Sequence, residues 1–319
     1  MRILIELPSW LGDTVMVTPA IQNLLKYYKD SEFVLIGPAI SIDALKTSEL
    51  VFKSKIIDKN YFSLYSLSKS LGKFDVFFSF RRSYRSTFLK SLISSRHKFQ
   101  FNRKKYQDSH LVEKYNHFIN DSLKTNFKAE KLNIGSNSKS SKSSKAPLRP
   151  ILGINPGAAY GSAKIWYPEE YAIVANALSS QYKILIFGSN SEKKIADDIE
   201  ALIIKKGVSN FENLAGKTSI SELIDLISNV DLFITGDSGP MHLAASFQIP
   251  SITIFGPTID KETSQWMNKK SVIVKKNLDC QPCMKRVCPL KHHNCMKLIK
   301  ASDILIAIDS LDLTPEKAS

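Results

Sequence analysis

The sequence of 319 residues lacks any apolar run of the roughly 18–20 residues that a membrane-spanning helix requires. Its first ten residues carry one positive charge and a short apolar stretch that Glu6 interrupts, and no small-residue cleavage site follows. This pattern is too short for a signal peptide and instead indicates a first buried strand. We therefore expect a protein that stays in the cytoplasm.

Several motifs of other protein classes are also missing. No Gly-x-Gly-x-x-Gly follows the first expected strand, which disfavours a dinucleotide-dependent dehydrogenase. The metal-binding pattern Asp-x-Asp is absent, so we expect chemistry that needs no metal ion. RNP-type aromatics, a helix-turn-helix signal and zinc-finger spacing are absent as well, which leaves a basic nucleic-acid-binding protein only as a remote alternative.

The first half of the chain is short of acidic residues. Residues 1–150 contain 26 Lys and Arg but only 12 Asp and Glu, whereas residues 151–319 contain 18 of each, so the net charge of +14 lies entirely in the first half. Such an asymmetry bears on partners rather than on fold. An anionic acceptor, an anionic membrane surface or a nucleic acid would each account for it, and a general lysine bias of the proteome would do so without any function.

Length and patterning predict two α/β domains. A chain of this length suggests about two domains, because single cores stop growing at smaller sizes. Short apolar strands alternate with amphipathic helices in both halves, which predicts parallel sheets covered by helices. We expect strands at residues 2–7, 33–36, 55–58, 74–80, 151–155, 183–187, 231–235 and 251–255, and helices at residues 14–29, 83–94, 109–123, 168–179, 191–205, 219–228 and 239–247.

A polar segment separates the two halves. Residues 135–145 contain only Gly, Ser, Asn and Lys, so we interpret them as a flexible linker or exposed loop. The chain then divides into a Rossmann-like domain at residues 1–146 and a second one at residues 147–319, whose last helix could pack back on the first domain. Ligands of such sheets bind beyond the carboxyl ends of the strands.

The first candidate motif is Leu-Gly-Asp-Thr at residues 11–14, where the first strand ends and the first helix begins. Gly12 permits a tight turn. Asp13 is placed either to cap the helix or to act as a general base on a hydroxyl group, and its spacing alone favours neither role.

A second motif, Gly-Asp-Ser-Gly-Pro-Met-His at residues 236–242, begins a helix after another strand. Ser238 and Asp237 are good N-cap residues, and the free N–H groups of a helix N-terminus form a ready phosphate site. The charge of Asp237 would repel phosphate, so we expect this residue to bind a sugar hydroxyl or to hold the loop. His242, one turn into the helix, is by itself more typical of a packed structural histidine than of a catalytic one.

The third motif is a loop of small residues at 155–166, which ends with Lys164 and Trp166. Small residues let the backbone approach a phosphate closely, and the lysine supplies a positive charge. The loop lacks the Gly-Lys-Ser/Thr order of a Walker A motif, so we do not expect a P-loop ATPase.

Taken in this order, the three motifs resemble glycosyltransferase family 9, the ADP-heptose:lipopolysaccharide heptosyltransferases. The match comprises Trp-Leu-Gly-Asp-Thr-Val-Met at residues 10–16, Asn-Pro-Gly at 155–157 with Lys-x-Trp-x-Pro at 164–168, and Asp-Ser-Gly-Pro-Met-His at 237–242. The first of these is closer to the heptosyltransferase II branch than to heptosyltransferase I. The resemblance implies the GT-B fold, in which two Rossmann-like domains with parallel sheets face a cleft.

The resemblance also implies an inverting, metal-independent enzyme without a cofactor. It would move L-glycero-D-manno-heptose from ADP-heptose, held mainly by the C-terminal domain, onto the heptose of an anionic lipid A–Kdo–heptose acceptor, held mainly by the N-terminal domain. The alternatives are a heptosyltransferase I and a GT-B transferase that uses another nucleotide sugar.

Roles for single residues follow from the same resemblance. Asp13 would be the general base and Lys164 would hold the diphosphate. Some relatives have threonines where this chain has Ala159 and Tyr160, so phosphate contacts there would fall to backbone N–H groups. The donor-binding set would be Gly12, Lys164, Glu192, Asp237, Ser238, Gly239 and His242.

Basic residues of the first half are candidates to meet the carboxylates and phosphates of the acceptor, because arginine matches the geometry of both groups. Solvated loop charges without a function are an equally good explanation. Through the same basic face we expect peripheral contact with the inner face of the inner membrane, and no nucleic acid or obligate protein partner. The candidates are Arg81, Arg82, Arg85, Arg103, Lys104 and Lys105.

All four cysteines lie in one segment, as Cys280-x2-Cys283-x4-Cys288-x6-Cys295, with two histidines inside it. In a cytosolic protein such clustering indicates a metal site more often than disulfides. The spacing does not match paired zinc knuckles, so a structural metal, reduced thiols and disulfides all stay open. We expect no catalytic role for these cysteines and no catalytic metal.

Overall fold

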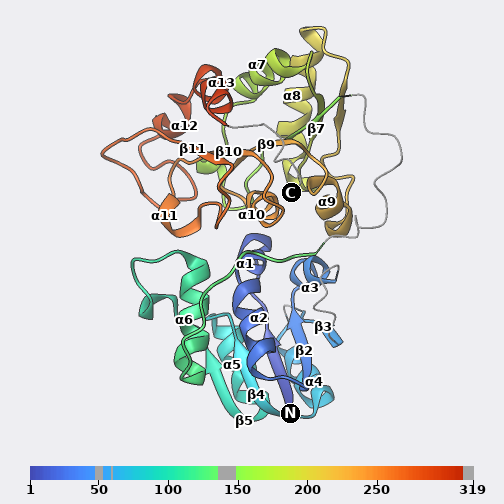
Figure 1. Cartoon of the computed structure of the whole chain (residues 1–319), viewed down its shortest axis with the longest axis vertical. Coiled ribbons are helices and arrows are strands. Elements are labelled where there is room, and N and C mark those ends of the chain that lie inside the picture. The colour runs from blue at the N-terminus through green and yellow to red at the C-terminus, as the bar shows by residue number, and fades with distance from the viewer. Residues whose placement is uncertain (47–52, 59, 136–148, 312–319) are drawn as a thin grey trace, which may run out of the picture. The chain divides into compact units, whose positions relative to one another are not determined.

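The computed structural model describes residues 1–46, 53–58, 60–135 and 149–311. Its contacts divide the chain into two units, Met1–Ser136 and Asn137–Ser319, and each unit is built on its own sheet (Figure 1). The predicted boundary at residue 146 and the predicted linker, apart from Gly135, lie outside the described residues.

The N-terminal unit contains a five-stranded parallel sheet with the order β3-β2-β1-β4-β5. Its central strand β1 is a continuous apolar run whose Ile3, Leu4 and Ile5 are fully buried, as is typical of a parallel strand covered on both faces. The strands are β1 Arg2–Glu6, β2 Glu32–Gly37, β3 Lys53–Ile56, β4 Lys73–Ser79 and β5 Ser94–Gln100.

The helices of this unit form two groups, since α2 packs against α6 and α4 packs against α5. The expected single helix at 14–29 is two helices, because Pro19 has no N–H to continue the first one. The carbonyl of Val15 accepts a hydrogen bond from the Thr18 hydroxyl instead (2.7 Å). The helices are α1 Leu11–Met16, α2 Thr18–Tyr27, α3 Ala39–Leu45, α4 Tyr61–Leu71, α5 Tyr84–Leu92, α6 Leu111–Leu123 and the short 3-10 helix η1 Arg103–Lys105.

The C-terminal unit contains a six-stranded parallel sheet with the order β11-β10-β9-β6-β7-β8. Its central strands carry the buried core residues Ile154 and Ile234. The strands are β6 Ile151–Asn155, β7 Lys183–Ile186, β8 Phe211–Asn213, β9 Leu232–Gly236, β10 Ser251–Ile254 and β11 Ser271–Val274.

Helix α9 of the C-terminal unit begins at the cap that its sequence predicts. The capping box at α9 is confirmed, with the Ser219 hydroxyl accepting from the Glu222 backbone N–H. The last helix, α13, packs against α7 and buries Ile304 in the core of this unit. The helices are α7 Pro168–Leu178, α8 Lys193–Lys205, α9 Ile220–Ile227, α10 Gly239–Ser246, α11 Asp260–Thr263, α12 Asn294–Lys297, α13 Ala301–Asp309, and the 3-10 helices η3 Ser162–Lys164 and η4 Asn190–Glu192.

Both sheets reverse their strand order beside their first strand. In the N-terminal unit β1 lies between β2 and β4, and in the C-terminal unit β6 lies between β7 and β9. Open α/β sheets bind ligands at such switch points, outside the carboxyl ends of the strands. The loops that follow β1 and β4, and those that follow β6 and β9, are therefore the places to look for a site.

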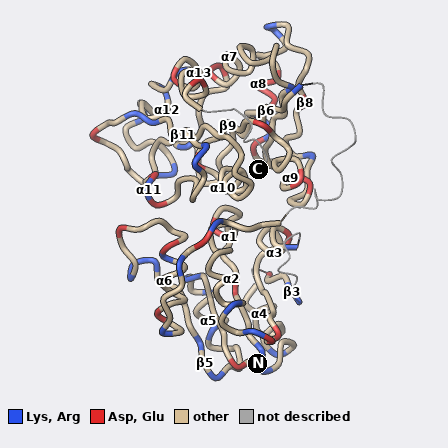
Figure 2. The backbone as a smooth tube through the Cα atoms, in the orientation of Figure 1, with Lys and Arg blue, Asp and Glu red and all other residues tan. Residues whose placement is uncertain are grey.

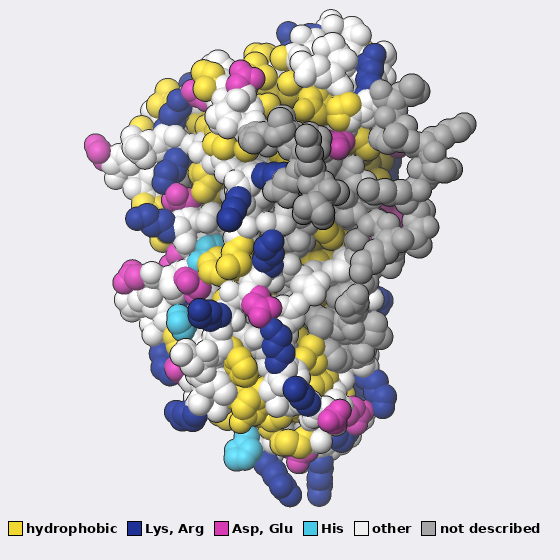
Figure 3. Space-filling model, viewed as in Figure 1, with side chains coloured by type: hydrophobic (Ala, Val, Ile, Leu, Met, Phe, Trp, Pro, Cys, Tyr) yellow, Lys and Arg dark blue, Asp and Glu magenta, His cyan; other side chains and the backbone are white. Residues whose placement is uncertain are grey.

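Charged residues occur in both units, and some hydrophobic side chains lie at the surface. Figure 2 marks the Lys and Arg positions of the two units in blue and the Asp and Glu positions in red. On the face of the molecule shown in Figure 3, hydrophobic side chains (yellow) lie among Lys and Arg side chains (dark blue). Among the described residues, no helix is long and apolar enough to cross a membrane.

Candidate active site

Asp13 lies at the carboxyl edge of the N-terminal sheet, where β1 leads into α1. It is the third residue of α1 and half-buried, whereas the N-cap is Trp10 in an extended conformation (φ −105°, ψ 144°). The interpretation of Asp13 as an N-cap is therefore wrong. Gly12 is also helical and buried, so the tight turn expected of it is wrong too, since the chain bends at Ser9 and Trp10. Asp13 is instead the acidic residue in the first turn of α1, where its charge favours the helix dipole, and its role as a general base stays a prediction.

Tyr115 of α6 is buried, and the charge of Asp13 influences the pKa of its phenol. Burial is the largest cause that raises the pKa of its phenol well above the usual value, and the negative charge of Asp13 adds to it. The positive charge of Arg103 acts in the opposite direction. Tyr115 therefore keeps its proton at neutral pH and adds no second negative charge to this edge.

Arg81 is engaged with a buried carboxylate at the same edge. Glu6, the last residue of β1, is 1% exposed and accepts hydrogen bonds from the hydroxyls of Ser79 and Ser86 (both 2.6 Å). The Arg81 guanidinium lies 3.6 Å from its other oxygen, and the Arg81 side chain is only 14% exposed. Burial raises the pKa of Glu6 despite these partners. Arg81 is thus in part a structural counter-ion rather than a fully exposed basic residue.

The other predicted acceptor residues follow β4 and β5. Because the order β1-β4-β5 places these strands side by side, residues after each strand line one edge together with Asp13. Arg85 is half-buried, and the Lys105 ammonium donates a hydrogen bond to Asp121, which raises the pKa of that lysine. The exposed members of the group are Arg82, Arg103, Lys104 and Lys105.

In the C-terminal unit, Lys164 and Asp237 meet at the switch point between β6 and β9. Lys164 ends η3, and its Nζ lies 2.5 Å from Asp237 Oδ2 and 3.2 Å from the Asp237 carbonyl oxygen. The two side chains are 11% and 7% exposed. The ring of Tyr160 lies 4.7 Å from the same ammonium group. The lysine is therefore held at one position by a buried counter-ion and an aromatic ring.

Asp237 connects the loops after three strands. Its Oδ2 also accepts a hydrogen bond from the hydroxyl of Thr258, which follows β10 (2.6 Å). Asn155, at the end of β6, donates to the hydroxyl of Ser238 (3.3 Å). Of the two roles considered for Asp237, these contacts support the role of holding the loop.

The N-terminus of α10 lies beside Lys164 and Asp237, because the helix begins directly after Asp237 and Ser238. Ser238 is its N-cap by backbone conformation, but its side chain makes no capping hydrogen bond and lies 3.0 Å from the Thr235 hydroxyl instead. The first N–H groups of the helix, beginning at Gly239, are therefore not occupied by a side-chain cap, and such groups favour an anion. His242, one turn further on, is buried (3% exposed).

Glu192 lies against the loop of small residues. Its Oε2 accepts hydrogen bonds from the backbone N–H and the hydroxyl of Ser189 (both 2.8 Å), which forms a capping box at η4. A Cβ on Gly157 would lie 2.2 Å from the Glu192 carboxyl carbon, so a larger residue there would require the Glu192 side chain to move. The loops after β6 and β7 are thus in direct contact.

Sequence reasoning missed two residues at this edge, Thr258 and Arg286. The Arg286 carbonyl accepts a hydrogen bond from the Ala163 N–H (3.0 Å), and its guanidinium lies 5.3 Å from the centre of the Tyr160 ring. The Tyr160 hydroxyl donates to the Met284 carbonyl (2.8 Å). The cysteine segment is therefore packed on the Lys164 loop. The one signal for it in the sequence is Tyr160, which replaces the threonine of some relatives.

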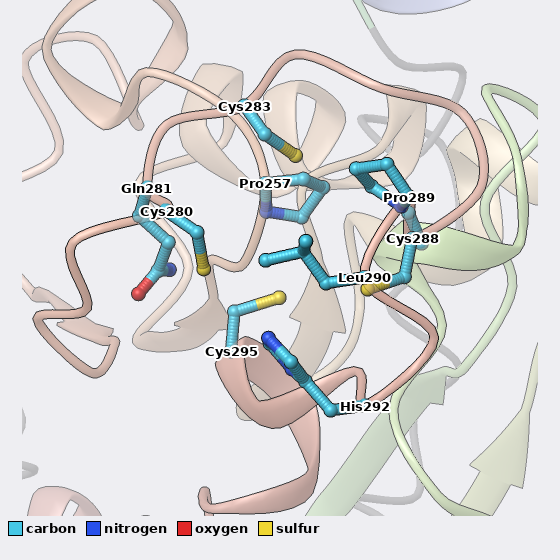
Figure 4. A pocket seen from close by; sticks show the side chains of 10 residues that line it. Pro257, Cys280, Gln281, Cys283, Cys288, Pro289, Leu290, His292 and Cys295 are labelled. Carbon is cyan, nitrogen blue, oxygen red and sulfur yellow. The ribbon is translucent and has the colours of Figure 1, made fainter.

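The cysteines surround a small pocket within that segment. Figure 4 shows the side chains of all four around it, together with those of Leu290 and His292. All four are free thiols, and burial and the other three thiols raise the pKa of Cys295 to about 11. Among the described residues, no group of three or more His, Cys, Asp or Glu side chains is placed to hold a metal ion. The free thiols disfavour disulfides, and the structural metal and the reduced thiols both stay open.

Comparison with known proteins gives the family. The model of glycosyltransferase family 9 (heptosyltransferase) matches residues 76–294. A lipooligosaccharide heptosyltransferase 2 of Campylobacter jejuni is 39% identical over 317 residues, covering 96% of each chain. The lipopolysaccharide heptosyltransferase 2 of Escherichia coli is 33% identical over 126 residues, which covers 39% of this chain and 36% of that protein.

Solved structures share the fold. E. coli ADP-heptose lps heptosyltransferase II has a TM-score of 0.80 at 22% identity and covers 97% of this chain and 98% of its own. The family 9 glycosyltransferase of Veillonella parvula has a TM-score of 0.84 at 18% identity, with coverage of 97% and 96%. The α/β fold with two parallel sheets, predicted from the motifs as GT-B, is confirmed by these likenesses. This chain is therefore a glycosyltransferase and belongs to glycosyltransferase family 9, the heptosyltransferases.

Proposed function

We propose that this enzyme transfers L-glycero-D-manno-heptose from ADP-heptose to the heptose already present on the lipopolysaccharide inner core. The observation that carries the proposal is the Lys164–Asp237–Thr258 cluster beside the uncapped N-terminus of α10. A buried cation and free helix N–H groups at a strand switch point suit a nucleoside diphosphate. The names of the Campylobacter and E. coli relatives support the heptose and the second-heptose step.

The donor would be bound by the C-terminal unit, in the expected domain at residues 147–319. Lys164 and the first N–H groups of α10 would contact the diphosphate, and Asp237 would keep the lysine in place. Arg286 adds a second positive charge close to Tyr160, where threonines are missing. Glu192 lies beside the loop of small residues and is the candidate for the nucleoside. The remaining expected donor contacts are Gly12, Ser238, Gly239 and His242.

The acceptor would be bound by the N-terminal unit, in the expected domain at residues 1–146. Asp13 removes the proton from the acceptor hydroxyl while that oxygen attacks the anomeric carbon of the heptose. The bond from this carbon to the ADP phosphate oxygen breaks, so the configuration inverts and ADP leaves with the electron pair. Lys164 and the α10 N-terminus stabilise the negative charge that grows on the diphosphate.

No step of this reaction needs a resident metal or cofactor. The exposed basic residues after β4 and β5 would neutralise the carboxylates and phosphates of the acceptor. A lipid-linked acceptor requires peripheral contact with the membrane, and we propose the cytoplasmic face of the inner membrane as the place of the reaction.

The test is a donor and acceptor matrix with purified enzyme. ADP release and product mass are measured with ADP-heptose and either a Kdo-lipid acceptor or the same acceptor already carrying one heptose. Turnover only with the heptose-bearing acceptor supports the proposal. Turnover only with the bare acceptor would reassign the enzyme to the first-heptose step, and turnover only with another nucleotide sugar would overturn the donor.

A further inference from the structure

Helices α4 and α5 of the N-terminal unit expose aromatic side chains that their own packing does not use. Phe62 at the start of α4 is 77% exposed, and Tyr84 at the start of α5 is 94% exposed. Tyr61, Tyr65 and Phe88 are 49%, 47% and 38% exposed. Single exposed apolar side chains are ordinary, whereas a contiguous exposed apolar patch marks an interaction site.

These five aromatics lie on two helices that are in contact, and we call them together the aromatic face. On α4 the pair Tyr61 and Tyr65 is four residues apart, as are Tyr84 and Phe88 on α5, so each pair lies on one side of its helix. The rings of Tyr61 and Phe88 are in contact across the two helices, with their centres 5.3 Å apart. Contact between the helices thus joins the two pairs.

Other residues of α4 and α5 already make the core. Leu64 and Leu71 of α4 and Leu89 of α5 are buried with Leu4 and Phe77 of the sheet. The fold of the unit is therefore satisfied without the aromatic face, and its exposure is not a packing requirement.

The charge around the aromatic face is mainly positive. Residues 60–72 and 80–100, which contain both helices, include seven Lys and Arg and no Asp or Glu. Lys69 places its ammonium 5.4 Å from the Tyr65 ring, and Arg82 is exposed just before α5. Exposed aromatics among mainly basic residues, with Asp58 as an exposed acidic residue just before α4, suit the interface of an anionic bilayer, where rings sit among the head groups and lysines meet phosphates.

The position of the helices is consistent with a lipid-linked substrate. Strands β3 and β4 lead into α4 and α5, so both helices begin at the carboxyl edge of the sheet. Asp13 follows β1 at that same edge. A bilayer against the aromatic face would therefore present a lipid-linked acceptor to the edge that carries Asp13.

We propose that the aromatic face is a docking surface for an anionic lipid bilayer. The affinity for lipid stands on the observations above, and only its use in delivering the acceptor rests on the proposed function. Both aromatic and basic groups contribute, so binding requires anionic lipid and weakens with salt.

The experiment is co-sedimentation of the full-length enzyme with vesicles of phosphatidylcholine alone and of phosphatidylcholine with phosphatidylglycerol. We expect binding to the mixed vesicles only, and its loss as salt rises to about 0.5 M, where screening is strong. The double variant Phe62→Ser/Tyr84→Ser is expected to bind at least about tenfold more weakly, because two rings no longer enter the interface. The matched control is Ile306→Ser, which changes an apolar residue that is 68% exposed in the C-terminal unit and should bind as the wild type does.

The outcomes separate this proposal from the reaction. Turnover on a water-soluble acceptor without the lipid chains should be unchanged in the double variant. Equal binding of wild type and double variant would overturn the docking surface, as would equal binding to both kinds of vesicle. A wild type that binds no vesicles but forms a dimer that the double variant loses would assign the aromatic face to a second copy instead. A failed transfer reaction with intact vesicle binding would leave this surface standing.

Discussion

The two units use the same sheet plan but hold their charged groups differently. In the C-terminal unit Lys164 is 11% exposed and fixed by Asp237, which is itself bound by Thr258. In the N-terminal unit most of the basic candidates are exposed and follow strands β4 and β5. A fixed cation suits a small ligand of constant shape, whereas exposed charges suit a larger anionic partner through attraction over distance. The comparison predicts that substitutions in the two units affect different kinetic constants.

The largest effect is expected from Asp13→Asn. Loss of a general base lowers kcat by about a thousandfold, within the usual range for such groups, while the KM for ADP-heptose changes little. The control Asp43→Asn alters an exposed ion pair with Lys46 in the same unit and should leave kcat unchanged. Steady-state kinetics of both variants provides the measurement, and near-normal kcat in Asp13→Asn would end the general-base assignment.

A smaller loss is expected from Lys164→Ala. Without the cation, kcat/KM for the donor should fall by about a hundredfold, and ADP should inhibit more weakly. The variant also leaves Asp237 as a buried carboxylate without its counter-ion, so the free energy of unfolding should drop by about 3 kcal/mol. Urea denaturation separates the two effects. Lys194→Ala, with a side chain that is 88% exposed, is the control, and an unchanged donor constant in Lys164→Ala would contradict the donor site.

For the acceptor side, the double variant Arg82→Ala/Lys104→Ala should raise the acceptor KM by about three- to tenfold and leave the donor KM unchanged. Its acceptor KM should also depend less on salt, because these charges are exposed. Lys29→Ala, an exposed charge after the end of α2, is the matched control. If the donor KM changes and the acceptor KM does not, the assignment of the acceptor to the N-terminal unit is wrong.

Glu6 gives a pH-dependent prediction. Burial raises its pKa in the folded protein above the value of 4.5, so the folded state binds this proton more tightly than the unfolded chain does. Its contribution to stability is then complete below pH 4.5 and is lost as pH rises through the raised value. The stability of Glu6→Gln relative to wild type should therefore increase with pH. Urea unfolding at several pH values measures the difference, and a decrease with pH would show that Arg81 and the two serine hydroxyls outweigh burial.

The smallest effect concerns the reactivity of the Cys295 thiol, which can be measured in the wild-type protein. With a pKa of about 11, its thiol should react with iodoacetamide more slowly than the three other cysteines at pH 8, since the thiolate is the nucleophile. Peptide mass spectrometry after timed alkylation gives the four rates. Equal rates at all four positions would mean that the packing around Cys295 opens easily in solution.

The sequence predicts those elements of the fold whose signal is local. Strands β1 and β6 were expected because they are short apolar runs, and the capping box at Ser219 and Glu222 is visible from spacing alone. Strand β5 was missed because Ser94–Gln100 is mostly polar and none of its residues is fully buried, so nothing marks it before it pairs with β4. The break between α1 and α2 depends on Pro19, whose effect an apolar pattern with helical period conceals.

For the site, the sequence located the loops but not their contacts. The motifs placed Lys164 and Asp237 after separate strands, and only the strand order β9-β6 brings them together. Arg286 could not be found, because its approach to Tyr160 depends on how a loop without regular structure crosses the sheet edge. The general-base role of Asp13 stays a prediction, and its position inside α1 became known only from the structure.

Gly161 lies where two segments that are distant in the sequence come into close contact, the Lys164 loop and the cysteine segment. With φ of +154°, a Cβ on this residue would lie 2.4 Å from the carbonyl oxygen of Arg286. Any larger side chain would have to push the cysteine segment outward and break the hydrogen bond from Ala163 to that same oxygen. The neighbouring Lys164 would then lose its alignment although no catalytic atom had been altered. Because Gly161 has no side chain, the Lys164 loop and the cysteine segment can stay in close contact. A displacement of either one would therefore displace the other.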